Sequence, residues 1–153
     1  MKLRKLSIDD MDLLTRLRID FLLDEQIEFS DDELVDIELK CREFFTSAFE
    51  LNRFIAFVAE DNDKVLSTAF LTIHEKPPRK ANIPFQVGTV YNVLTYKEYR
   101  RTGLATQVLT ALLNESKSMG IKTIDLWATE DGENLYEKLG FWKINCAPMR
   151  IDF

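Results

Sequence analysis

The sequence of 153 residues has few of the residues that build disulfide scaffolds and metal sites. It contains two cysteines, one histidine, five glycines and four prolines. Two distant cysteines, Cys41 and Cys146, provide neither a disulfide framework nor metal-ligand spacing, so we expect small apolar fillers, no bound metal and a reducing, cytoplasmic location. The chain also lacks internal repeats and low-complexity stretches, which excludes a collagen-like or disordered protein.

Positive charge and long apolar runs are scarce as well. Lys and Arg number 20 against 26 Asp and Glu, a formal net charge of −6, whereas a nucleic-acid partner requires a basic surface. The N-terminal residues reach Asp9 and Asp10 before any apolar stretch develops, and no window is apolar enough to span a membrane. We therefore expect a protein with no nucleic-acid and no membrane partner.

What the sequence does contain is material for a core. Hydrophobic residues make up 46% of the chain, including 11 Phe, four Tyr and two Trp. A chain of this length can bury about two-thirds of the surface that it exposes when unfolded. These values predict a single domain over residues 1–153.

The hydrophobic periodicity predicts a mixed α/β domain in the order ααβββαβαβ. Capping boxes at residues 7–10 and 30–33 should begin two helices, which run to about Leu23 and Glu50. The remaining elements are expected as strands at 54–60, 65–74, 85–95 and 123–128, helices at 103–119 and 132–139, one or two strands within 141–153, and a proline loop at 75–84. Gly88 is a possible bulge in the third strand.

The segment from Tyr99 to Thr106, between a predicted strand and a predicted helix, has the features of an anion site. Gly103 allows the backbone to approach a ligand closely, and the first N–H groups of a helix are unpaired donors. Positive charges exceed negative ones in this loop, with Lys97, Arg100 and Arg101 against Glu98. Taken alone, the segment equally fits a glycine that starts a helix beside solvated arginines.

A second motif makes the first more specific. The pattern Leu-Tyr-x-Lys-x-Gly-Phe is matched at Leu135, Tyr136, Lys138, Gly140 and Phe141, and Gln/Arg-x-x-Gly-x-Gly/Ala is matched at Arg100, Gly103 and Ala105. With both motifs in this order, the chain resembles the GNAT superfamily of N-acetyltransferases, which transfer an acyl group from acyl-CoA to an amine. The order of elements also fits, so the resemblance covers essentially the whole chain.

The resemblance implies the acyl-CoA N-acyltransferase fold, with a largely antiparallel sheet that is splayed at its middle to seat acetyl-CoA as the cosubstrate. Pantetheine would pair like an added strand with the backbone of Val93, Leu94 and Thr95. Pyrophosphate contacts would come from the motif and the start of the helix, at Arg100, Arg101, Thr102, Gly103, Leu104, Ala105 and Thr106. Thr129, where the family often has an asparagine, would be a further cofactor contact.

The resemblance also points to Tyr136 as the acid that protonates the departing CoA thiolate, although a core aromatic or a positioning role remains an alternative. The base stays open, because the glutamate that the family often carries on the third strand is absent. The candidates are His74, Glu75, a water held by Tyr91 or Asn92 as substrate-binding residues, or an amine that arrives neutral.

The predicted function is acetyl transfer to a primary amine by direct attack in a ternary complex. The acceptor is a small-molecule or peptide amine, and the acidic residues Glu130, Asp131 and Glu133 either attract a cationic acceptor or complement a helix dipole. The alternatives are a non-catalytic acyl-CoA-binding module and a domain that has lost its ligand. The resemblance further suggests a homodimer through the C-terminal strands.

Overall fold

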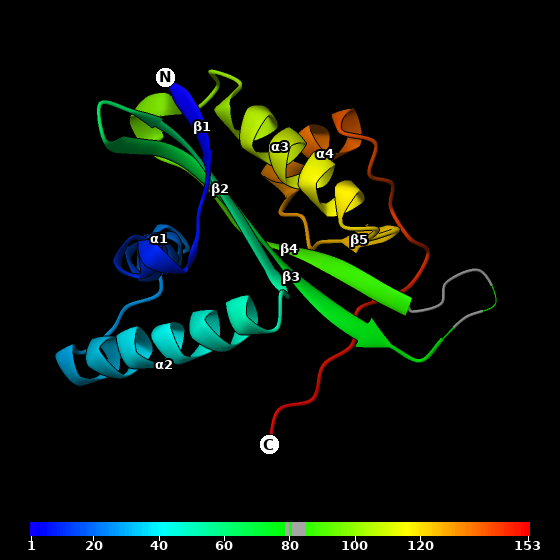
Figure 1. Cartoon of the computed structure of the whole chain (residues 1–153), viewed down its shortest axis with the longest axis horizontal. Helices are drawn as coiled ribbons and strands as arrows, with labels where there is room; N and C mark the ends of the chain where they lie inside the picture. The colour runs from blue at the N-terminus through cyan, green and yellow to red at the C-terminus, as the bar shows by residue number, and fades with distance from the viewer. Residues whose placement is uncertain (79, 81–84) are drawn as a thin grey trace.

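The computed structural model describes residues 1–78, 80 and 85–153, and in these residues one five-stranded sheet separates two helical layers (Figure 1). The strands lie across the sheet in chain order: β1 (Lys2–Lys5), β2 (Phe54–Asp61), β3 (Lys64–Lys76), β4 (Phe85–Thr95) and β5 (Thr123–Asp125). Neighbouring strands are antiparallel except β4 and β5, which are parallel. The mixed α/β class and the largely antiparallel sheet are therefore confirmed.

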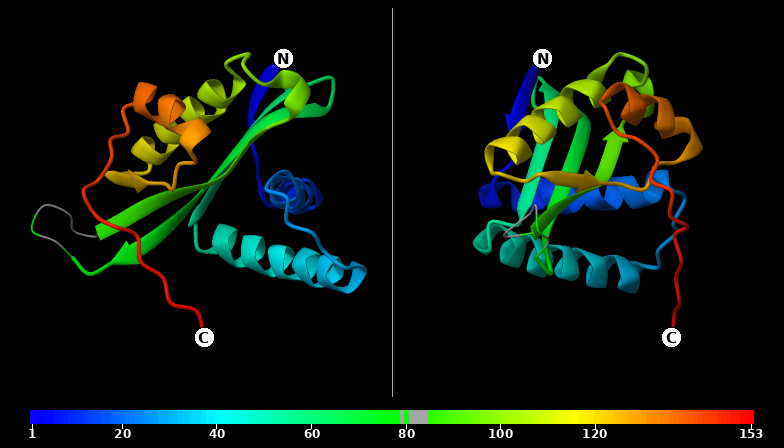
Figure 2. Two further views of the ribbon diagram at one scale, coloured as in Figure 1. Left: turned by 180° about the vertical axis from the view of Figure 1, so that it is seen from behind. Right: turned by 90° about the vertical axis from the view of Figure 1, so that its right-hand side faces the viewer.

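Helices cover both faces of the sheet (Figure 2). The first layer contains α1 (Met11–Asp24) and α2 (Asp31–Glu50), and the second contains α3 (Leu104–Ser118) and α4 (Glu133–Lys138). Under the first layer, Leu14, Phe45 and Phe70 belong to one buried cluster. Under α3, Leu71 and Leu109 belong to another. Helices α1, α2 and α3 thus each bury apolar side chains against the sheet, whereas α4 has no fully buried residue.

Both expected capping boxes are present. The amide of Glu33 donates to Ser30 Oγ over 3.3 Å, while the Glu33 carboxylate accepts from the Ser30 amide over 2.8 Å, at the start of α2. The box at Ser7 begins a 3-10 turn (Ile8–Asp10), and α1 follows from Met11. These reciprocal bonds satisfy amides that have no partner within the helix.

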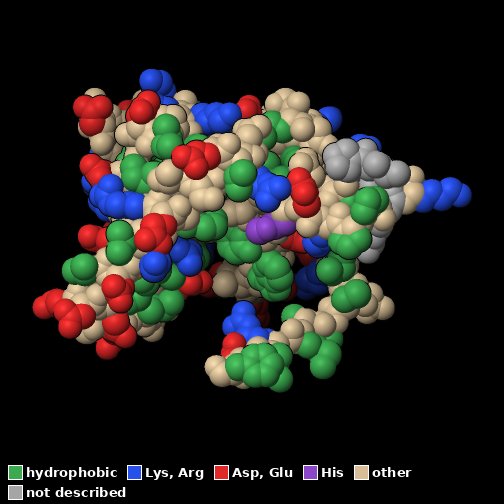
Figure 3. All heavy atoms as spheres, turned by 60° about the horizontal axis from the view of Figure 1, so that its bottom comes forward, with side chains coloured by type: hydrophobic (Ala, Val, Ile, Leu, Met, Phe, Trp, Pro, Cys, Tyr) green, Lys and Arg blue, Asp and Glu red, His purple; other side chains and the backbone are tan. Residues whose placement is uncertain are grey.

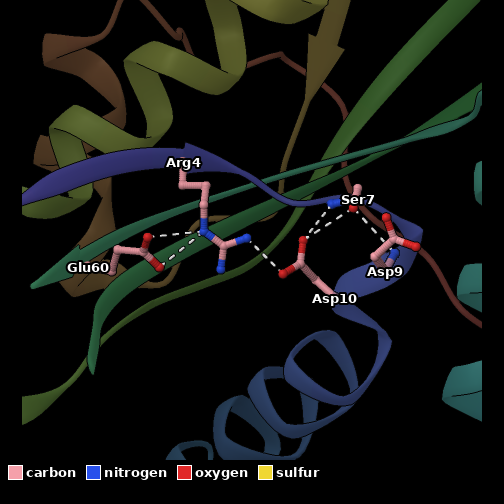
Figure 4. Close-up of polar contacts among 5 residues, drawn as sticks. All are labelled: Arg4, Ser7, Asp9, Asp10 and Glu60. Carbon is pink, nitrogen blue, oxygen red and sulfur yellow. Dashed lines mark hydrogen bonds and ion pairs between the residues drawn. The ribbon is translucent and has the colours of Figure 1, made fainter. Parts of the chain in front are cut away.

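Strand β1 was not expected from the sequence. It is short and charged, as edge strands often are, and Arg4 at its centre holds three elements together (Figure 4). The Arg4 Nε atom lies 3.0 Å from Glu60 of β2, and Nη1 lies 2.7 Å from Asp10 at the start of α1. Burial opposes ionisation of Asp10, but the Ser7 amide and the Arg4 guanidinium together hold the pKa of Asp10 below its usual value.

The ladder between β3 and β4 is broken by a bulge that lies four residues from its expected position. Tyr91 pairs with Phe70 and Leu94 pairs with Thr68, so Asn92 and Val93 together oppose a single residue of β3. Asn92 has a φ of +53°, a conformation that asparagine tolerates better than most side chains.

At Gly88, where the bulge was expected, the ladder is regular. Gly88 pairs with Ile73 on one side and Ile124 on the other. A Cβ atom at Gly88 would lie 3.0 Å from Leu71 Cδ1. Gly88 therefore allows Leu71 to pack closely against β4 beneath α3, and it does not interrupt strand pairing.

The strands expected within residues 141–153 are absent, and that segment has no regular secondary structure. Apolar side chains alternate along it and are exposed, among them Trp142, Ile144, Met149, Ile151 and Phe153. Alternation indicates a strand only where a partner strand supplies hydrogen bonds. The adjacent edge strand β5 covers only Thr123–Asp125, half of the expected 123–128, and offers little to pair with.

Other boundaries differ modestly. Strand β3 continues through Glu75 and Lys76, which were expected in the proline loop, and the rest of that loop lies partly outside the described residues. The expected hairpin is confirmed, with Asn62 and Asp63 at φ of +48° and +62° between β2 and β3. Positive φ at both central residues is the conformation of a tight two-residue hairpin turn.

Candidate active site

A row of unpaired backbone donors lies where β4 leads into α3. Gly103 is the N-cap of α3 with a φ of +82°, and the first helical hydrogen bond runs from the Gln107 amide to the Gly103 carbonyl. Within the described chain, the amides of residues 101–106 donate to no protein acceptor. A Cβ atom at Gly103 would meet nothing within 4 Å. Open space therefore faces a cluster of N–H groups at the positive end of a helix dipole, which suits an anion.

Hydrogen bonds hold the loop in front of this helix. Thr102 Oγ1 donates to the Tyr99 carbonyl over 2.5 Å. The Arg100 side chain turns away from the helix start, because its Nε donates to the Thr95 carbonyl and its Nη2 lies 2.8 Å from Asp24 of α1. The structure therefore gathers the backbone of residues 101–106, while the guanidinium of Arg100 fastens the loop to α1.

Strands β4 and β5 part in the portion of β4 that precedes this loop. They pair only from Val87–Thr123 to Thr89–Asp125, and beyond that point β4 continues without a described partner strand on its β5 side (Figure 1). The predicted cofactor residues Val93, Leu94 and Thr95 lie in this continuation. Their backbone therefore borders a gap in the sheet that leads toward the start of α3.

Tyr136 lies on α4, with its ring packed on the core beneath α3 and against Phe141 at a ring-centre distance of 5.9 Å. Gly132 makes room for the ring, since a Cβ atom there would lie 3.1 Å from Tyr136 Cε2. Thr129 is close by, and its carbonyl accepts from the Gly132 amide over 2.9 Å. Burial raises the pKa of Tyr136, so its hydroxyl stays protonated at neutral pH, as a proton donor requires.

Helix α1 is joined to the end of β4 by several side chains. The contacts are Asn92 Nδ2 to the Leu17 carbonyl at 3.0 Å, Arg18 Nη1 to Asn92 Oδ1 at 3.3 Å, the Tyr96 hydroxyl to the Asp20 carboxylate, and Arg100 to Asp24. Burial and the Asp20 charge raise the pKa of Tyr96. The bulge in β4 therefore has a fixed position relative to α1.

An apolar hollow of about 430 Å³ lies between α1, α2 and the sheet, on the face opposite α3. Phe45, Phe54 and Phe70 line it and are almost fully buried, whereas Phe44 and Tyr91 line it and are partly exposed. Figure 3 shows green hydrophobic side chains around the single histidine on this side of the molecule. The sequence carries no local signal for this hollow, because its walls come from five separate elements.

The predicted candidates for a base have different surroundings. His74 lines the hollow, and its Nε2 lies 2.8 Å from Thr72 Oγ1. Glu75 pairs with Arg53 over 3.0 Å and lines a neighbouring hollow of about 650 Å³ along α2. The side-chain amide of Asn92 is engaged by α1, so of the two predicted substrate residues only Tyr91 is free to contact a ligand in the hollow.

The structure adds a carboxylate that the sequence analysis missed. Asp125 on β5 accepts a 2.6 Å hydrogen bond from Thr89 Oγ1 of β4, and Lys76 Nζ lies 4.0 Å from it. Paired residues of adjacent strands share a face of the sheet, so Asp125 lies on the face of Thr72, the side of the hollow. It stands where β4 and β5 part. A single acidic residue in the strand expected at 123–128 was the available signal.

Cys41 also lines the hollow, whereas Cys146 is exposed on the C-terminal segment. Burial raises the pKa of the Cys41 thiol. A thiol that stays protonated is a poor nucleophile. The described residues contain no group of three His, Cys, Asp or Glu side chains placed to hold a metal ion.

A mixed sheet whose parallel strands β4 and β5 part after three register pairs, followed by a helix with unpaired amides at its start, is the arrangement of an acyltransferase fold. The chain belongs to the GNAT acetyltransferase family, whose model matches residues 15–141. None of the described helices is both long and apolar enough to cross a membrane.

Similar proteins support this assignment. An uncharacterized N-acetyltransferase, YycN, from Bacillus subtilis (strain 168) is 35% identical over 75 residues, which are 47% of this chain and 46% of that protein. The match thus spans about half the length of this curated relative. A predicted acetyltransferase from Clostridium acetobutylicum, crystallised with acetyl-CoA, is 29% identical with a TM-score of 0.86, over 99% of this chain and 95% of that one. A GCN5-related N-acetyltransferase from Ralstonia eutropha JMP134 has the same fold, with a TM-score of 0.76 at 22% identity over 98% and 97% of the two chains.

Proposed function

We propose that residues 1–153 form one cytoplasmic enzyme domain, which transfers an acetyl group from acetyl-CoA to a primary amine by direct attack in a ternary complex. The observation that carries this proposal is the row of unpaired amides at residues 101–106, which faces open space beside the gap between β4 and β5. The likeness to the Clostridium acetobutylicum protein, which was crystallised with acetyl-CoA, supports the choice of cosubstrate.

The residues present suit the pyrophosphate and the pantetheine of acetyl-CoA. The amides at the start of α3 would bind the pyrophosphate, and the exposed Arg101 adds positive charge there. The free backbone edge of Val93, Leu94 and Thr95 would pair with the pantetheine amides, as an added strand pairs with a sheet edge. Thr129 Oγ1 and the Tyr136 ring both lie beside Gly132, and Thr129 completes the set of proposed contacts.

The proposed reaction needs three proton transfers. The amine nitrogen bonds to the thioester carbonyl carbon, the carbon–sulfur bond breaks, and the Tyr136 hydroxyl gives its proton to the departing sulfur. The nitrogen, which is positively charged after its attack, then loses a proton that restores the Tyr136 hydroxyl. The attacking ammonium must lose a proton, and Asp125 is the carboxylate at the mouth of the gap that accepts it, directly or through water. Holding amine and thioester together lowers the barrier further, by up to about 7–11 kcal/mol in the best-oriented cases.

Direct attack is favoured over an acyl-enzyme because of the state of Cys41. The thiol lines the hollow, but its raised pKa leaves little thiolate at neutral pH. Incubation of the protein with acetyl-CoA alone should therefore leave Cys41 unmodified in a peptide mass spectrum. A stable acetyl group on Cys41 that an added amine removes would contradict direct attack.

The proposal is tested by calorimetric titration with acetyl-CoA of the wild type, Gly103→Glu and Gly120→Glu. Both glycines have a φ of +82°, belong to opposite ends of α3 and face open space, so the two variants carry the same backbone strain and charge. Only Gly103→Glu introduces a carboxylate beside the unpaired amides of residues 101–106, so only this variant should lose acetyl-CoA binding. Binding without thiol release on a broad amine panel would favour the non-catalytic module, and no binding by the folded wild type would end the enzyme proposal.

The homodimer is a further proposal. Exposed, alternating apolar side chains at Trp142, Ile144 and Ile151 support an interface along the C-terminal segment, because monomers rarely leave such rows in water. Light scattering should give twice the chain mass of 17.9 kDa, and a monomer mass would reject the interface.

A further inference from the structure

The hollow opposite α3 has the size and lining of a small-molecule site. Its volume of about 430 Å³ lies near the lower end of the range of ligand pockets, about 300–1,000 Å³. Its deep walls are the buried rings of Phe45, Phe54 and Phe70, which stack edge-on or tilted against one another at centre distances of 5.0–5.8 Å. An occupant of this space must bring an apolar body of side-chain size.

One charged group at the wall of the hollow lacks an opposite charge. Other cations around this region are neutralised, since Lys40 pairs with Glu43 at 2.7 Å and Arg53 pairs with Glu75 at 3.0 Å. Arg18 contacts Asn92 Oδ1 and lies 5.5 Å from the centre of the Phe21 ring, and no described carboxylate lies within ion-pair distance of it. A half-buried guanidinium in apolar surroundings favours an anionic partner.

The position of Arg18 fixes where that anion would lie. Its Nη1 is 3.3 Å from the side chain of Asn92, the residue of the β4 bulge, and the neighbouring Tyr91 lines the hollow. The bulge borders the gap in which the proposed function places the acetyl group. A ligand must therefore carry its anionic group and its reacting amine close together, at the end of the hollow next to Arg18 and Asn92, with its apolar part in the rest of the hollow.

We propose that the acceptor is a free α-amino acid with a large apolar side chain. Its carboxylate binds Arg18, its amine faces the β4 bulge and its side chain fills the space between Phe44 and Phe70. In an α-amino acid, the amine and the carboxylate are bonded to the same carbon atom. They can therefore reach Arg18 and the β4 bulge, which lie side by side, at the same time. Polyamines are excluded, because a second ammonium would be buried among aromatic rings beside a like charge. Polyhydroxylated amines would leave hydroxyl groups without partners there.

This inference rests on the proposed function, and two measurements separate them. Thiol release from acetyl-CoA is followed with L-phenylalanine, L-phenylalanine amide, phenethylamine and spermidine, and the products are identified by mass spectrometry. L-Phenylalanine binding is measured on its own by calorimetry, without acetyl-CoA. We expect acetylation of L-phenylalanine with a kcat/KM at least 10-fold above that of the amide and of phenethylamine, and negligible activity on spermidine.

Variants of Arg18 supply the specific test. Arg18→Gln should raise the KM or Kd for L-phenylalanine about 10- to 100-fold, as expected for a lost charge-assisted hydrogen bond, with a smaller change in kcat. The same variant should act on L-phenylalanine and phenethylamine almost equally, and Arg18→Lys should recover part of the difference. Arg16→Gln removes the same charge from an exposed position of α1 and should match the wild type.

Either of two results would overturn the inference alone. One is acetyl-CoA binding and amine turnover in which phenethylamine or spermidine equals or exceeds L-phenylalanine. The other is an Arg18→Gln variant, folded by circular dichroism, that keeps the wild-type preference for the carboxylate. Loss of the proposed function would look different, with no acetyl-CoA binding by the wild type. In that case, L-phenylalanine binding that depends on Arg18 would still support the site, and its absence would reject it.

Discussion

The side-chain amide of Asn92, at the bulge of β4, donates a 3.0 Å hydrogen bond to the Leu17 carbonyl on α1. Asn92 is 2% exposed and has a φ of +53°. Asn92 therefore has two structural effects. Its left-handed backbone conformation forms the bulge in β4, and its side chain holds α1 against that bulge. The shape of the gap in the sheet depends on this link.

Replacement of Asn92 should separate these two contributions. Asn92→Gly keeps the positive φ and loses the bonds to α1, and we expect it to lower the free energy of unfolding by about 1–3 kcal/mol. Asn92→Ala also forces a Cβ atom into the left-handed region and should cost about 1 kcal/mol more. Urea denaturation measures both. Equal stability of the two variants would show that the bulge relaxes when the bonds are lost.

Tyr136→Phe should lower kcat about 100-fold or more and leave the affinity for acetyl-CoA within a few-fold of wild type. The hydroxyl supplies a proton only when the thiolate departs, while the ring and its contact with Phe141 remain. Steady-state turnover and calorimetric titration of the same preparations provide the comparison. If turnover is unchanged, the leaving thiolate takes its proton from water.

Asp125→Asn should lower kcat/KM about 100-fold at neutral pH if the carboxylate takes the proton of the ammonium. The loss should shrink as the pH rises toward the pKa of the acceptor amine, because a neutral amine needs no base. A milder loss is expected for Thr89→Val, which removes the 2.6 Å hydrogen bond that orients Asp125. A pH–rate profile of Asp125→Asn that superimposes on wild type at every pH would eliminate Asp125 as the base.

Asp10 should make stability depend on pH. The pKa of this carboxyl is lower in the folded protein than in the unfolded chain, so its ion pair with Arg4 contributes stability above the usual carboxyl pKa of about 4. That contribution is lost as the pH falls through the folded-state value.

The comparison that isolates this effect is urea unfolding of wild type and Asp10→Asn between pH 3 and pH 7. The variant should be about 1 kcal/mol less stable at pH 7, and the difference should narrow toward pH 3. Asp12→Asn is the control, because the Asp12 side chain is 90% exposed in its pair with Arg42 and should contribute little. A difference between wild type and Asp10→Asn that is constant with pH would exclude the linkage.

The sequence predicted those features that depend on residues a few positions apart in the chain. Both capping boxes, the Asn62–Asp63 turn and Gly103 at the start of α3 are found where residue chemistry within a few positions dictates them. Features that depend on distant partners were missed. The charged strand β1 exists because β2 offers it an edge, and the apolar alternation after residue 141 forms no strand because no comparable edge is available.

The candidate site divides in the same way. The loop before α3 and the segment around Tyr136 on α4 are contiguous motifs, so the sequence alone predicts them as site residues. Arg18 and Tyr91 line one hollow only when α1 and β4 are assembled, and Asp125 reaches Thr89 only when β5 pairs with β4. Their roles depend on which face of the sheet each side chain occupies, and the bulge at Asn92 changes that alternation in a way that the sequence does not show.

Three register pairs are all that join β5 to β4 in the described sheet, whereas β3 and β4 pair along most of their length. Opening β5 locally therefore breaks few backbone bonds, while α3 stays anchored by Leu109 and Leu112. Amide hydrogens of Thr123–Asp125 should exchange with solvent far faster than those in the centre of β3. A ligand that bridges the two parallel strands would slow this exchange. In the free protein, we expect the distance between β4 and β5 to fluctuate, because only three register pairs hold them together.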